Sequence, residues 1–283
     1  MPPKHPDTPP VGKGYVTRRV DRYRRDEHEH TNDAITEEVP VAMIYNDVLF
    51  AVMMVTPLDL DDFALGFSLS EGLIAKPDEL QSIEVRPQLE GVEIAMRVST
   101  TTVEDRAGQH GERLLPGRSG CGLCGARMLE DAVRHPKPVG RGPTIAAAAL
   151  EQALDSLRDA QPVNAETGSV HAAAWVDENG KIVMVREDVG RHNALDKLIG
   201  AMVKAGADAE RGFLLVTSRA SYEMVTKAAS AGITLMAAIS APTALAIHLA
   251  ESTGLTLIGF ARPGSYVVYT HPQRLRHAAG AHA

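Results

Sequence analysis

The sequence predicts an α/β sandwich with a largely parallel or mixed sheet, preceded by a smaller α+β domain. Segments with strand and helix character alternate from residue 171 to residue 269, which is the order expected of such a sandwich. Residues 39–98 instead place strand-like segments around a single helix. Hydrophobic residues make up 44% of the 283 positions and charged residues 23%, so the chain can bury an ordinary globular core.

Residues 1–30 are expected to form a flexible tail. Five of the first ten residues are proline, and the charged run from Arg18 to His30 contains few apolar side chains. A segment of this composition buries too little apolar surface to offset the entropy lost on ordering.

Residues 31–140 are predicted to form the N-terminal α+β domain, which carries the cysteine-rich loop. Strands at 39–45 and 49–55 are separated by the turn-forming pair Asn46-Asp47, which indicates a hairpin. Carboxylates at 59, 61 and 62 precede an apolar run, and acidic groups favour the positive end of a helix dipole, so a helix begins near Leu60. Alternating segments at 83–85 and 92–98 add further strands.

Residues 141–283 are predicted to form the α/β sandwich. Its first helix spans residues 145–157, where leucines at 150, 154 and 157 recur at helical spacing. Ligands of such sheets usually bind in the loops at the carboxyl ends of the strands. The predicted strands are 172–176, 182–185, 213–216, 233–239, 255–260 and 266–269, and the predicted helices are 191–204, 222–231 and 241–252.

Charge and cysteine content exclude several classes of protein. The net charge of −7 argues against a nucleic-acid-binding surface, so an anionic ligand needs a pocket of its own. Two cysteines in so long a chain fit a reducing compartment and not a disulfide framework. Arg18-Arg19 precedes charged residues where an export signal needs an apolar run, and Pro242 and His248 interrupt the most apolar region. We expect a cytoplasmic protein without a membrane span.

Cys121 and Cys124 lie three residues apart; Cys121 stands between two glycines, and Cys124 is followed by another. Because glycine loses more conformational freedom on ordering than any other residue, we expect the pair to lie on a mobile loop. Three chemistries remain open for it: half of a zinc site, a dithiol redox pair, or a carrier of covalent sulfur. Arg118 and Arg127 flank the thiols and would favour the nucleophilic thiolate, although both could be ordinary solvated arginines.

Three loops that follow predicted strands carry the second signal. The loop 217–221 places Arg219 and Ser221 before a helix, and the junction 186–193 does the same with Arg191 and His192. Arginine and free helix N–H groups are the usual means of binding phosphate, so these junctions indicate an anionic, nucleotide-like ligand. Simple N-capping by a serine of the first loop is the competing interpretation. The loop 260–265 is a third candidate, although its Pro263-Gly264 is also an ordinary turn signal.

His171 opens the first strand of the sandwich. A zinc deaminase would have a glutamate two residues later and a cysteine pair after that, whereas Ala173 occupies the first position and the cysteines come earlier in the chain. The sequence therefore argues against deamination and leaves a structural histidine as the alternative.

An ordered set of motifs resembles the formate dehydrogenase accessory sulfurtransferase family over roughly residues 40–275. No single motif is as specific as the whole set in this order. The matching segments are 61–67 with Glu71-Gly72, 121–125, 187–194 with Asp196-Lys197, 221–225 with Lys227, 240–243, and Tyr269-Thr270.

The resemblance implies a cytoplasmic homodimer whose residues 141–283 form a cytidine deaminase-like three-layer sandwich with a mixed sheet. It also implies a sulfurtransferase that takes persulfide sulfur from a cysteine desulfurase. The sulfur passes to the molybdenum cofactor carrying two guanine dinucleotides, bound as a substrate, and formate dehydrogenase becomes active. No metal of the protein's own is implied. A non-catalytic chaperone for the same cofactor is the alternative.

The resemblance also implies roles for individual residues. Cys121 matches the persulfide-bearing position and Cys124 its neighbour, which assists or resolves. The cofactor-binding segment corresponds to Phe260, Ala261, Arg262, Pro263, Gly264 and Ser265. From the phosphate argument we add Arg191, His192, Arg219 and Ser221 to the binding site.

Overall fold

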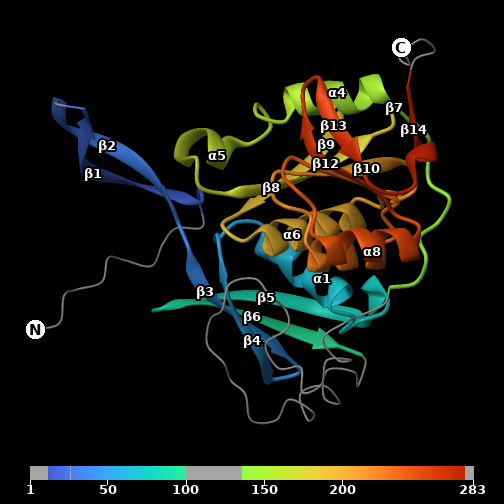
Figure 1. The fold of residues 1–283 in the computed structure, drawn as a ribbon. Coiled ribbons are helices and arrows are strands. Elements are labelled where there is room, and N and C mark those ends of the chain that lie inside the picture. The colour runs from blue at the N-terminus through green and yellow to red at the C-terminus, as the bar shows by residue number, and fades with distance from the viewer. Residues whose placement is uncertain (1–11, 26, 100–135, 278–283) are drawn as a thin grey trace, which may run out of the picture.

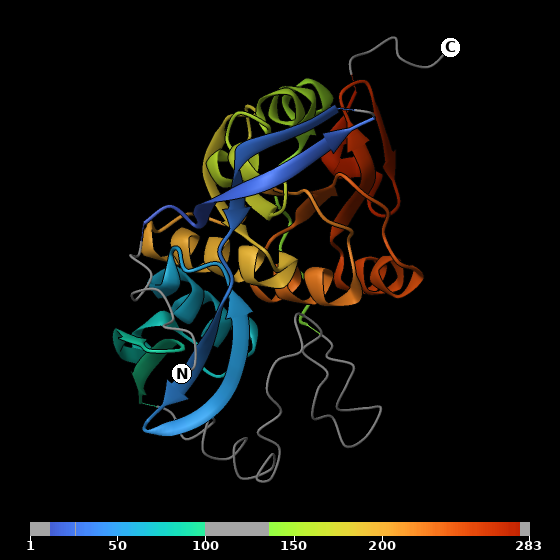
Figure 2. The ribbon, with the colours of Figure 1, turned by 90° about the vertical axis from the view of Figure 1, so that its left-hand side faces the viewer.

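The computed structural model describes residues 12–25, 27–99 and 136–277. The chain is built in layers that Figure 1 and Figure 2 show from two sides. A six-stranded sheet lies between α4 (Ala147–Ser156) on one face and α6 (Arg191–Lys204), α7 (Tyr222–Ser230) and α8 (Ala244–Thr253) on the other. Helix α1 (Leu60–Ser70) and a four-stranded sheet cover the outer side of α6.

The six-stranded sheet is mixed, as predicted. Its order is β13-β12-β11-β10-β8-β9 within the described ranges. β11 pairs parallel with both β10 and β12, whereas the pairs β10-β8, β8-β9 and β12-β13 are antiparallel. The mixed α/β class is therefore confirmed, and its cytidine deaminase-like character stays a prediction. The strands are β8 (His171–Asp177), β9 (Ile182–Asp188), β10 (Gly212–Val216), β11 (Leu235–Ala238), β12 (Thr256–Arg262) and β13 (Ser265–Val268).

Alternation along each strand divides the core between the two faces of this sheet. In β8, Ala173 and Trp175 pack toward α6, α7 and α8, whereas Ala174 and Val176 pack toward α4. Both sets are buried because helices cover both faces. The covering helices also set where the loops that connect them to the strands lie.

The second sheet has the order β4-β3-β6-β5 and is covered by α1. Helix α1 is buried nearly all round because it lies between this sheet and α6. The two helices cross at glycines: a Cβ on Gly66 would lie 1.7 Å from the carbonyl oxygen of Asp196, and one on Gly200 would lie 2.0 Å from that of Asp62. The strands of this four-stranded sheet are β3 (Val39–Tyr45), β4 (Val48–Val55), β5 (Leu80–Gln88) and β6 (Gly91–Val98).

The prediction of a flexible tail over residues 1–30 is wrong for most of the residues in this range that the structure describes. β1 (Tyr15–Arg24) and β2 (Glu27–Thr36) form an antiparallel hairpin that projects from the body in Figure 1. Cross-strand pairs of opposite charge stabilise it: Arg22 lies 3.5 Å from Glu29 and 3.3 Å from Asp33. The expected boundary after residue 30 therefore falls inside a strand.

Most other expected elements are confirmed, with small shifts at their ends. Helix α6 has the predicted bounds, whereas α8 begins at Ala244 and not at 241, because Thr243 caps it and Pro242 precedes the cap. The predicted division at residue 140 stays a prediction; Val139 already donates to the carbonyl of Thr253. The remaining elements are η1 (Pro77–Glu79), β7 (Ile145–Ala146), α5 (Pro162–Thr167), η2 (Pro272–Arg274) and β14 (Leu275–Arg276). In the described ranges, no helix has both the length and the apolar character that a bilayer span requires.

Candidate functional site

The carboxyl ends of β9, β10, β11 and β12 meet at one edge of the six-stranded sheet. The start of antiparallel β8 lies at the same edge, where His171 pairs with Asp188. The main chain joins the neighbouring loops: Ile239 N donates to Val216 O at 2.9 Å, and Phe260 N donates to Ser240 O at 3.2 Å. The loops after β10, β11 and β12 are thus neighbours. The junction 186–193 follows β9, on the far side of β8, at the same end of the sheet.

Helices α6, α7 and α8 all begin at this edge, each directly after a strand that ends there. Their N-termini direct free N–H groups and positive dipole ends toward it. At α8, Thr243 caps one of these N–H groups, because its hydroxyl accepts a hydrogen bond from the N–H of Ala246 at 3.3 Å. At α6 and α7 the residues preceding the helix, Gly190 and Ser221, make no side-chain cap.

Buried polar atoms without a hydrogen-bond partner gather at the N-termini of α6 and α7. Among the described residues, Arg191 Nε, Ser221 Oγ and Glu223 Oε1 are in this state. Ser218 does not cap α7 either, since its hydroxyl donates to the carbonyl of Arg219 at 3.0 Å. N-capping by serine therefore does not explain this loop. An unpaired buried donor costs about 1–3 kcal/mol, which an anionic ligand would recover at Arg191 Nε and Ser221 Oγ. The Glu223 carboxylate accepts only, so it needs a donor and not an anion.

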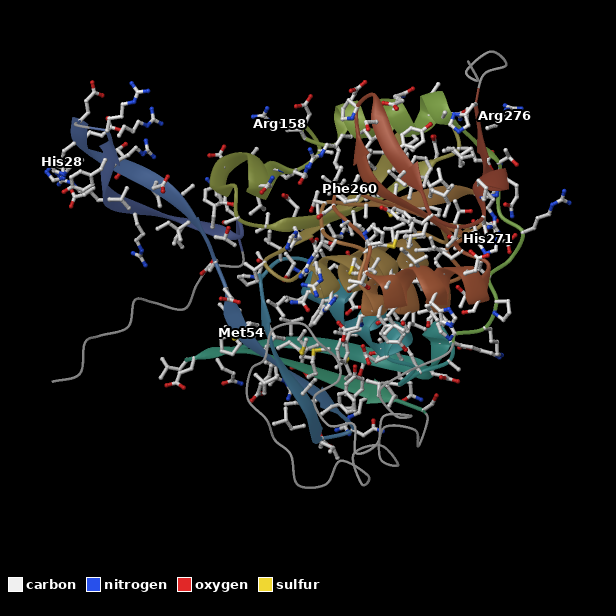
Figure 3. The ribbon with its side chains drawn as sticks, viewed as in Figure 1. His28, Met54, Arg158, Phe260, His271 and Arg276 are labelled. Carbon is white, nitrogen blue, oxygen red and sulfur yellow. The ribbon has the colours of Figure 1, made fainter. Side chains whose placement is uncertain are left out.

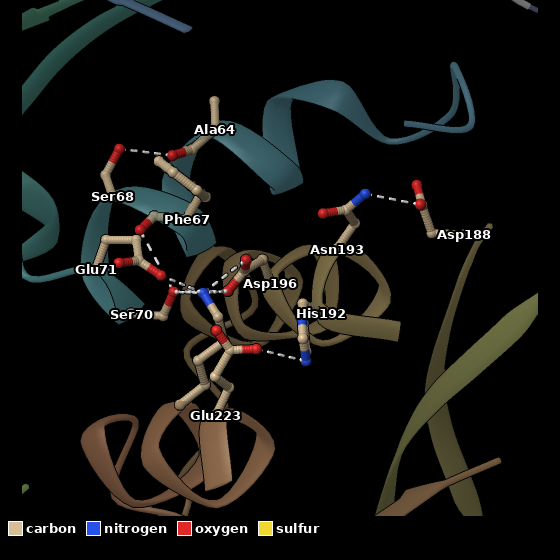
Figure 4. A network of polar contacts seen from close by, with 11 residues as sticks. Ala64, Phe67, Ser68, Ser70, Glu71, Asp188, His192, Asn193, Asp196 and Glu223 are labelled. Carbon is tan, nitrogen blue, oxygen red and sulfur yellow. Dashed lines mark hydrogen bonds and ion pairs between the residues drawn. The ribbon is translucent and has the colours of Figure 1, made fainter. Parts of the chain in front are cut away.

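His192 and Glu223 form an ion pair across this space. Figure 4 shows this contact. The Nε2 and Oε2 atoms are 2.9 Å apart, and the side chains are only 5% and 14% exposed. We assigned His192 to the site from the sequence but missed Glu223. The signal was available, because Glu223 stands in the first turn of α7 within a quoted motif.

His171 lies beside this pair. Burial lowers the pKa of its imidazole from 6.5, and the charges of Arg191 and His192 lower that pKa further, against the opposing charge of Asp188. A neutral imidazole therefore faces the site near neutral pH. His171 thus both begins strand β8 and lies at the candidate site.

A buried ion pair fixes the start of α6. Lys197 Nζ lies 2.7 Å from Asp188 Oδ2, and both side chains are fully buried. Asp188 also accepts from Gly190 N at 2.8 Å and from Asn193 Nδ2 at 2.9 Å, so the loop before α6 is held against the helix. The sequence showed these residues only as part of a motif, without their contacts.

A second buried network joins α1, α6 and α7, and Figure 4 shows it from close by. Lys227 Nζ lies 2.7 Å from Glu71 Oε1 and 2.9 Å from Asp196 Oδ2, and it donates to Ser70 Oγ at 2.9 Å. Burial acts to lower the pKa of Lys227, but the carboxylates of Asp196 and Glu71 outweigh it and hold that pKa above its ordinary range. The lysine is therefore charged, and it links the helix that carries His192 to the helix that carries Glu223.

The segment 260–265 reaches the edge only at its first residue. Phe260 has a left-handed backbone (φ 50°) and is 45% exposed, and Figure 3 shows its position. Such a φ is strained for a residue other than glycine. Ala261 is fully buried on the α4 side, so it offers no surface to a ligand. The exposed residues 262–265 form a turn, in which Gly264 N donates to Glu151 Oε2 of α4 at 2.8 Å.

The structure thus places Arg191, His192, Arg219 and Ser221 at the loops of one sheet edge, with Arg219 exposed. Cys121 and Cys124 lie outside the described residues, so their roles stay predictions. Within the described ranges, the one cluster of potential metal ligands lies on the β1-β2 hairpin, away from this edge.

Comparisons with known proteins identify relatives along nearly the whole chain. The model of the FdhD/NarQ family matches residues 36–276. A sulfur carrier protein FdhD from Xanthomonas euvesicatoria pv. vesicatoria is 54% identical over 270 residues, 95% of each chain. A protein of the same description from Cupriavidus necator is 47% identical over 268 residues, 94% of this chain and 91% of the relative. A crystal structure described as a formate dehydrogenase accessory protein from Desulfotalea psychrophila shares the fold, with TM-score 0.71 and 24% identity over 93% of this chain and 99% of that one.

Proposed function

Because the chain belongs to the FdhD/NarQ family, we propose that it is a sulfur carrier in the maturation of formate dehydrogenase. In this proposal a cysteine desulfurase supplies persulfide sulfur to Cys121. The protein then transfers the sulfur to the molybdenum cofactor carrying two guanine dinucleotides, which is a substrate and not a resident cofactor. We propose further that the carrier acts in the cytoplasm as a homodimer.

One observation carries the cofactor-binding half of the proposal: the N-termini of α6 and α7 meet at a sheet edge where buried polar atoms have no protein partner within the described ranges. The N–H groups and helix dipoles at such an edge suit the phosphates of a guanine dinucleotide. Arg191 and Arg219 supply positive charge, and Ser221 Oγ supplies a donor. Phe260 lies at the same edge with an exposed ring, suited to stacking on a base.

The sulfur-accepting half rests on thiol chemistry and on the sulfur-carrier description of the relatives. The Cys121 thiolate attacks the terminal sulfur of the desulfurase persulfide. A new S–S bond forms on Cys121 while the donor S–S bond breaks, and the donor cysteine leaves as a thiolate. In the second step the S–S bond on Cys121 would break, with Cys121 leaving as a thiolate. The sulfane sulfur would pass to the cofactor, and the two electrons that turn it into a sulfide ligand would come from the cofactor's reduced metal. Arg118 and Arg127 flank the pair and favour the thiolate form.

The same sheet edge also suits a protein that only holds the cofactor, so the two activities need separate tests. We would incubate the protein with a cysteine desulfurase and cysteine and measure its intact mass. Wild type should gain about 32 Da in a form that a reductant removes, as expected for one added sulfur atom. Cys121→Ala should gain none, and Cys124→Ala should gain the same mass as wild type. No gain on wild type would exclude the carrier and leave the non-catalytic chaperone.

Nucleotide binding is tested separately with GDP and titration calorimetry. Arg219→Ala and Ser221→Ala should weaken the binding of GDP, because they remove a charge and a donor at the sheet edge. Arg158→Ala and Ser156→Ala serve as matched controls, since both residues lie on or after α4, on the opposite face of the sheet. Equal losses in the two sets would place the nucleotide elsewhere.

A further inference from the structure

The β1-β2 hairpin sorts its charged side chains onto two faces. Residues opposite each other in an antiparallel pair share a face, and successive residues alternate between faces. Asp21 lies opposite His30, and Tyr23 lies opposite His28, so these four side chains share one face. The other face carries Arg22, which pairs with Glu29 and Asp33.

On the first face the two imidazoles converge on one carboxylate. His28 Nε2 lies 3.1 Å from Asp21 Oδ1, and His30 Nδ1 contacts the same oxygen. One ligand atom from each of the three residues lies within 4.8 Å of the others. A tetrahedral ion with bonds of about 2.1 Å needs its ligand atoms about 3.4 Å apart. Small side-chain rotations would therefore bring the three atoms into a coordination sphere.

Packing limits the rotation of both imidazoles. The ring of Tyr23 stacks on His28 with centroids 4.5 Å apart and planes at 17°, and His28 meets His30 edge-on at 5.0 Å. Asp21, His28 and His30 are 55%, 42% and 57% exposed, so water could complete the coordination of a bound ion. Arg22, whose cation would repel a metal, is paired on the opposite face.

From this geometry we propose that Asp21, His28 and His30 bind a divalent transition-metal ion of the zinc type. Two imidazoles and a carboxylate are ligands that Zn²⁺, Co²⁺ and Ni²⁺ accept, whereas Mg²⁺ and Ca²⁺ prefer oxygen alone. Two histidines at positions i and i+2 of a strand, opposite an aspartate, place three such ligands on one face. The site lies at the outer end of the hairpin, where Figure 3 shows His28, and it is independent of the sheet edge.

The test is calorimetric titration of the full chain with Zn²⁺, after alkylation of the cysteines so that Cys121 and Cys124 cannot bind the metal. Wild type should bind one ion per chain. Asp21→Asn, His28→Gln and His30→Gln should each weaken binding by at least tenfold, because loss of even an outer-shell partner changes metal affinity about 10–100-fold. Asp33→Asn, on the opposite face, should bind as wild type does.

Trypsin provides a second readout, since Arg24 ends β1 and Arg25 follows it in the turn. Zinc bound across the two strands should slow cleavage there in wild type and in Asp33→Asn, but not in His28→Gln. Circular dichroism checks that each variant remains folded. The proposal is wrong if wild type binds no zinc, or if the three ligand variants bind zinc as tightly as wild type does. The His–Asp contacts would then be surface ion pairs only.

Discussion

Replacing Lys227 by methionine should destabilise the protein strongly. The methionine keeps most of the apolar stem but removes the ammonium group that contacts Glu71, Asp196 and Ser70. Asp196 is 2% exposed and Glu71 13% exposed, so neither carboxylate regains water when the lysine is lost. Breaking a buried pair in this way costs about 3–5 kcal/mol.

Lys204→Met is the matched control. Lys204 Nζ lies 2.8 Å from Asp62 Oδ1, but its side chain is 42% exposed, and Asp62 also pairs with Arg186 at 2.7 Å. An exposed ion pair contributes about 0–1 kcal/mol. The same substitution should therefore change the free energy of unfolding several-fold less here than at Lys227.

Urea unfolding followed by circular dichroism measures both variants. Adding Asp196→Asn to Lys227→Met should recover part of the loss, because the double variant no longer buries an unpaired Asp196 carboxylate. If Lys227→Met and Lys204→Met lose the same free energy within about 0.5 kcal/mol, burial does not set the strength of this network and the reasoning fails.

Three further predictions concern the candidate site and the helix crossing. Burial and neighbouring cations lower the pKa of His171, so as the pH falls the unfolded chain takes up a proton there before the folded chain does. The free energy of unfolding should therefore fall as the pH drops below about 6.5. In urea unfolding between pH 5 and 8, the free energy of unfolding of His171→Asn should depend less on pH than that of wild type. Ser221→Ala should raise the unfolding free energy by up to about 1–3 kcal/mol, because it removes a buried hydroxyl that has no partner. Thr243→Ala, which removes a real N-cap, should instead lose about 1 kcal/mol in the same assay. Gly200→Ala should lower the melting temperature by more than Gly206→Ala, because its Cβ would meet the backbone of α1. Gly206 has open space around it, so alanine there adds only the strain of its left-handed backbone (φ +63°). An unchanged melting temperature for Gly200→Ala would show that the helices can move apart.

The sequence predicted the helices of the sandwich closely where an apolar stripe coincided with a start signal. Helix α6 follows the glycine at 190 and buries apolar residues at helical spacing, so both its existence and its bounds were readable. The junctions after β9 and β10 were singled out for a related reason, because each lies between a strand and a helix. The β1-β2 hairpin was missed because charged residues occupy both of its faces, so its strands have no apolar alternation to detect.

Partners in the buried networks could not be predicted. Lys227 contacts Ser70 across a separation of 157 residues, and Asp188 contacts Thr56 across 132. A lysine inside a helix reads as a solvated residue until the fold shows what surrounds it. The missed Glu223 is of the same kind, since its acidic charge also suits the first turn of any helix.

The position of α1 affects the segment that carries the cysteines. Because α1 packs against both the four-stranded sheet and α6, the described parts before and after that segment are in direct contact. Each part is hydrogen-bonded up to the segment: Ser99 N donates to Glu79 O, and Val139 N donates to Thr253 O. The chain between these points is therefore tethered at both ends to a single body. If Cys121 carries sulfur as proposed, transfer to a cofactor bound at the sheet edge would be an intramolecular step.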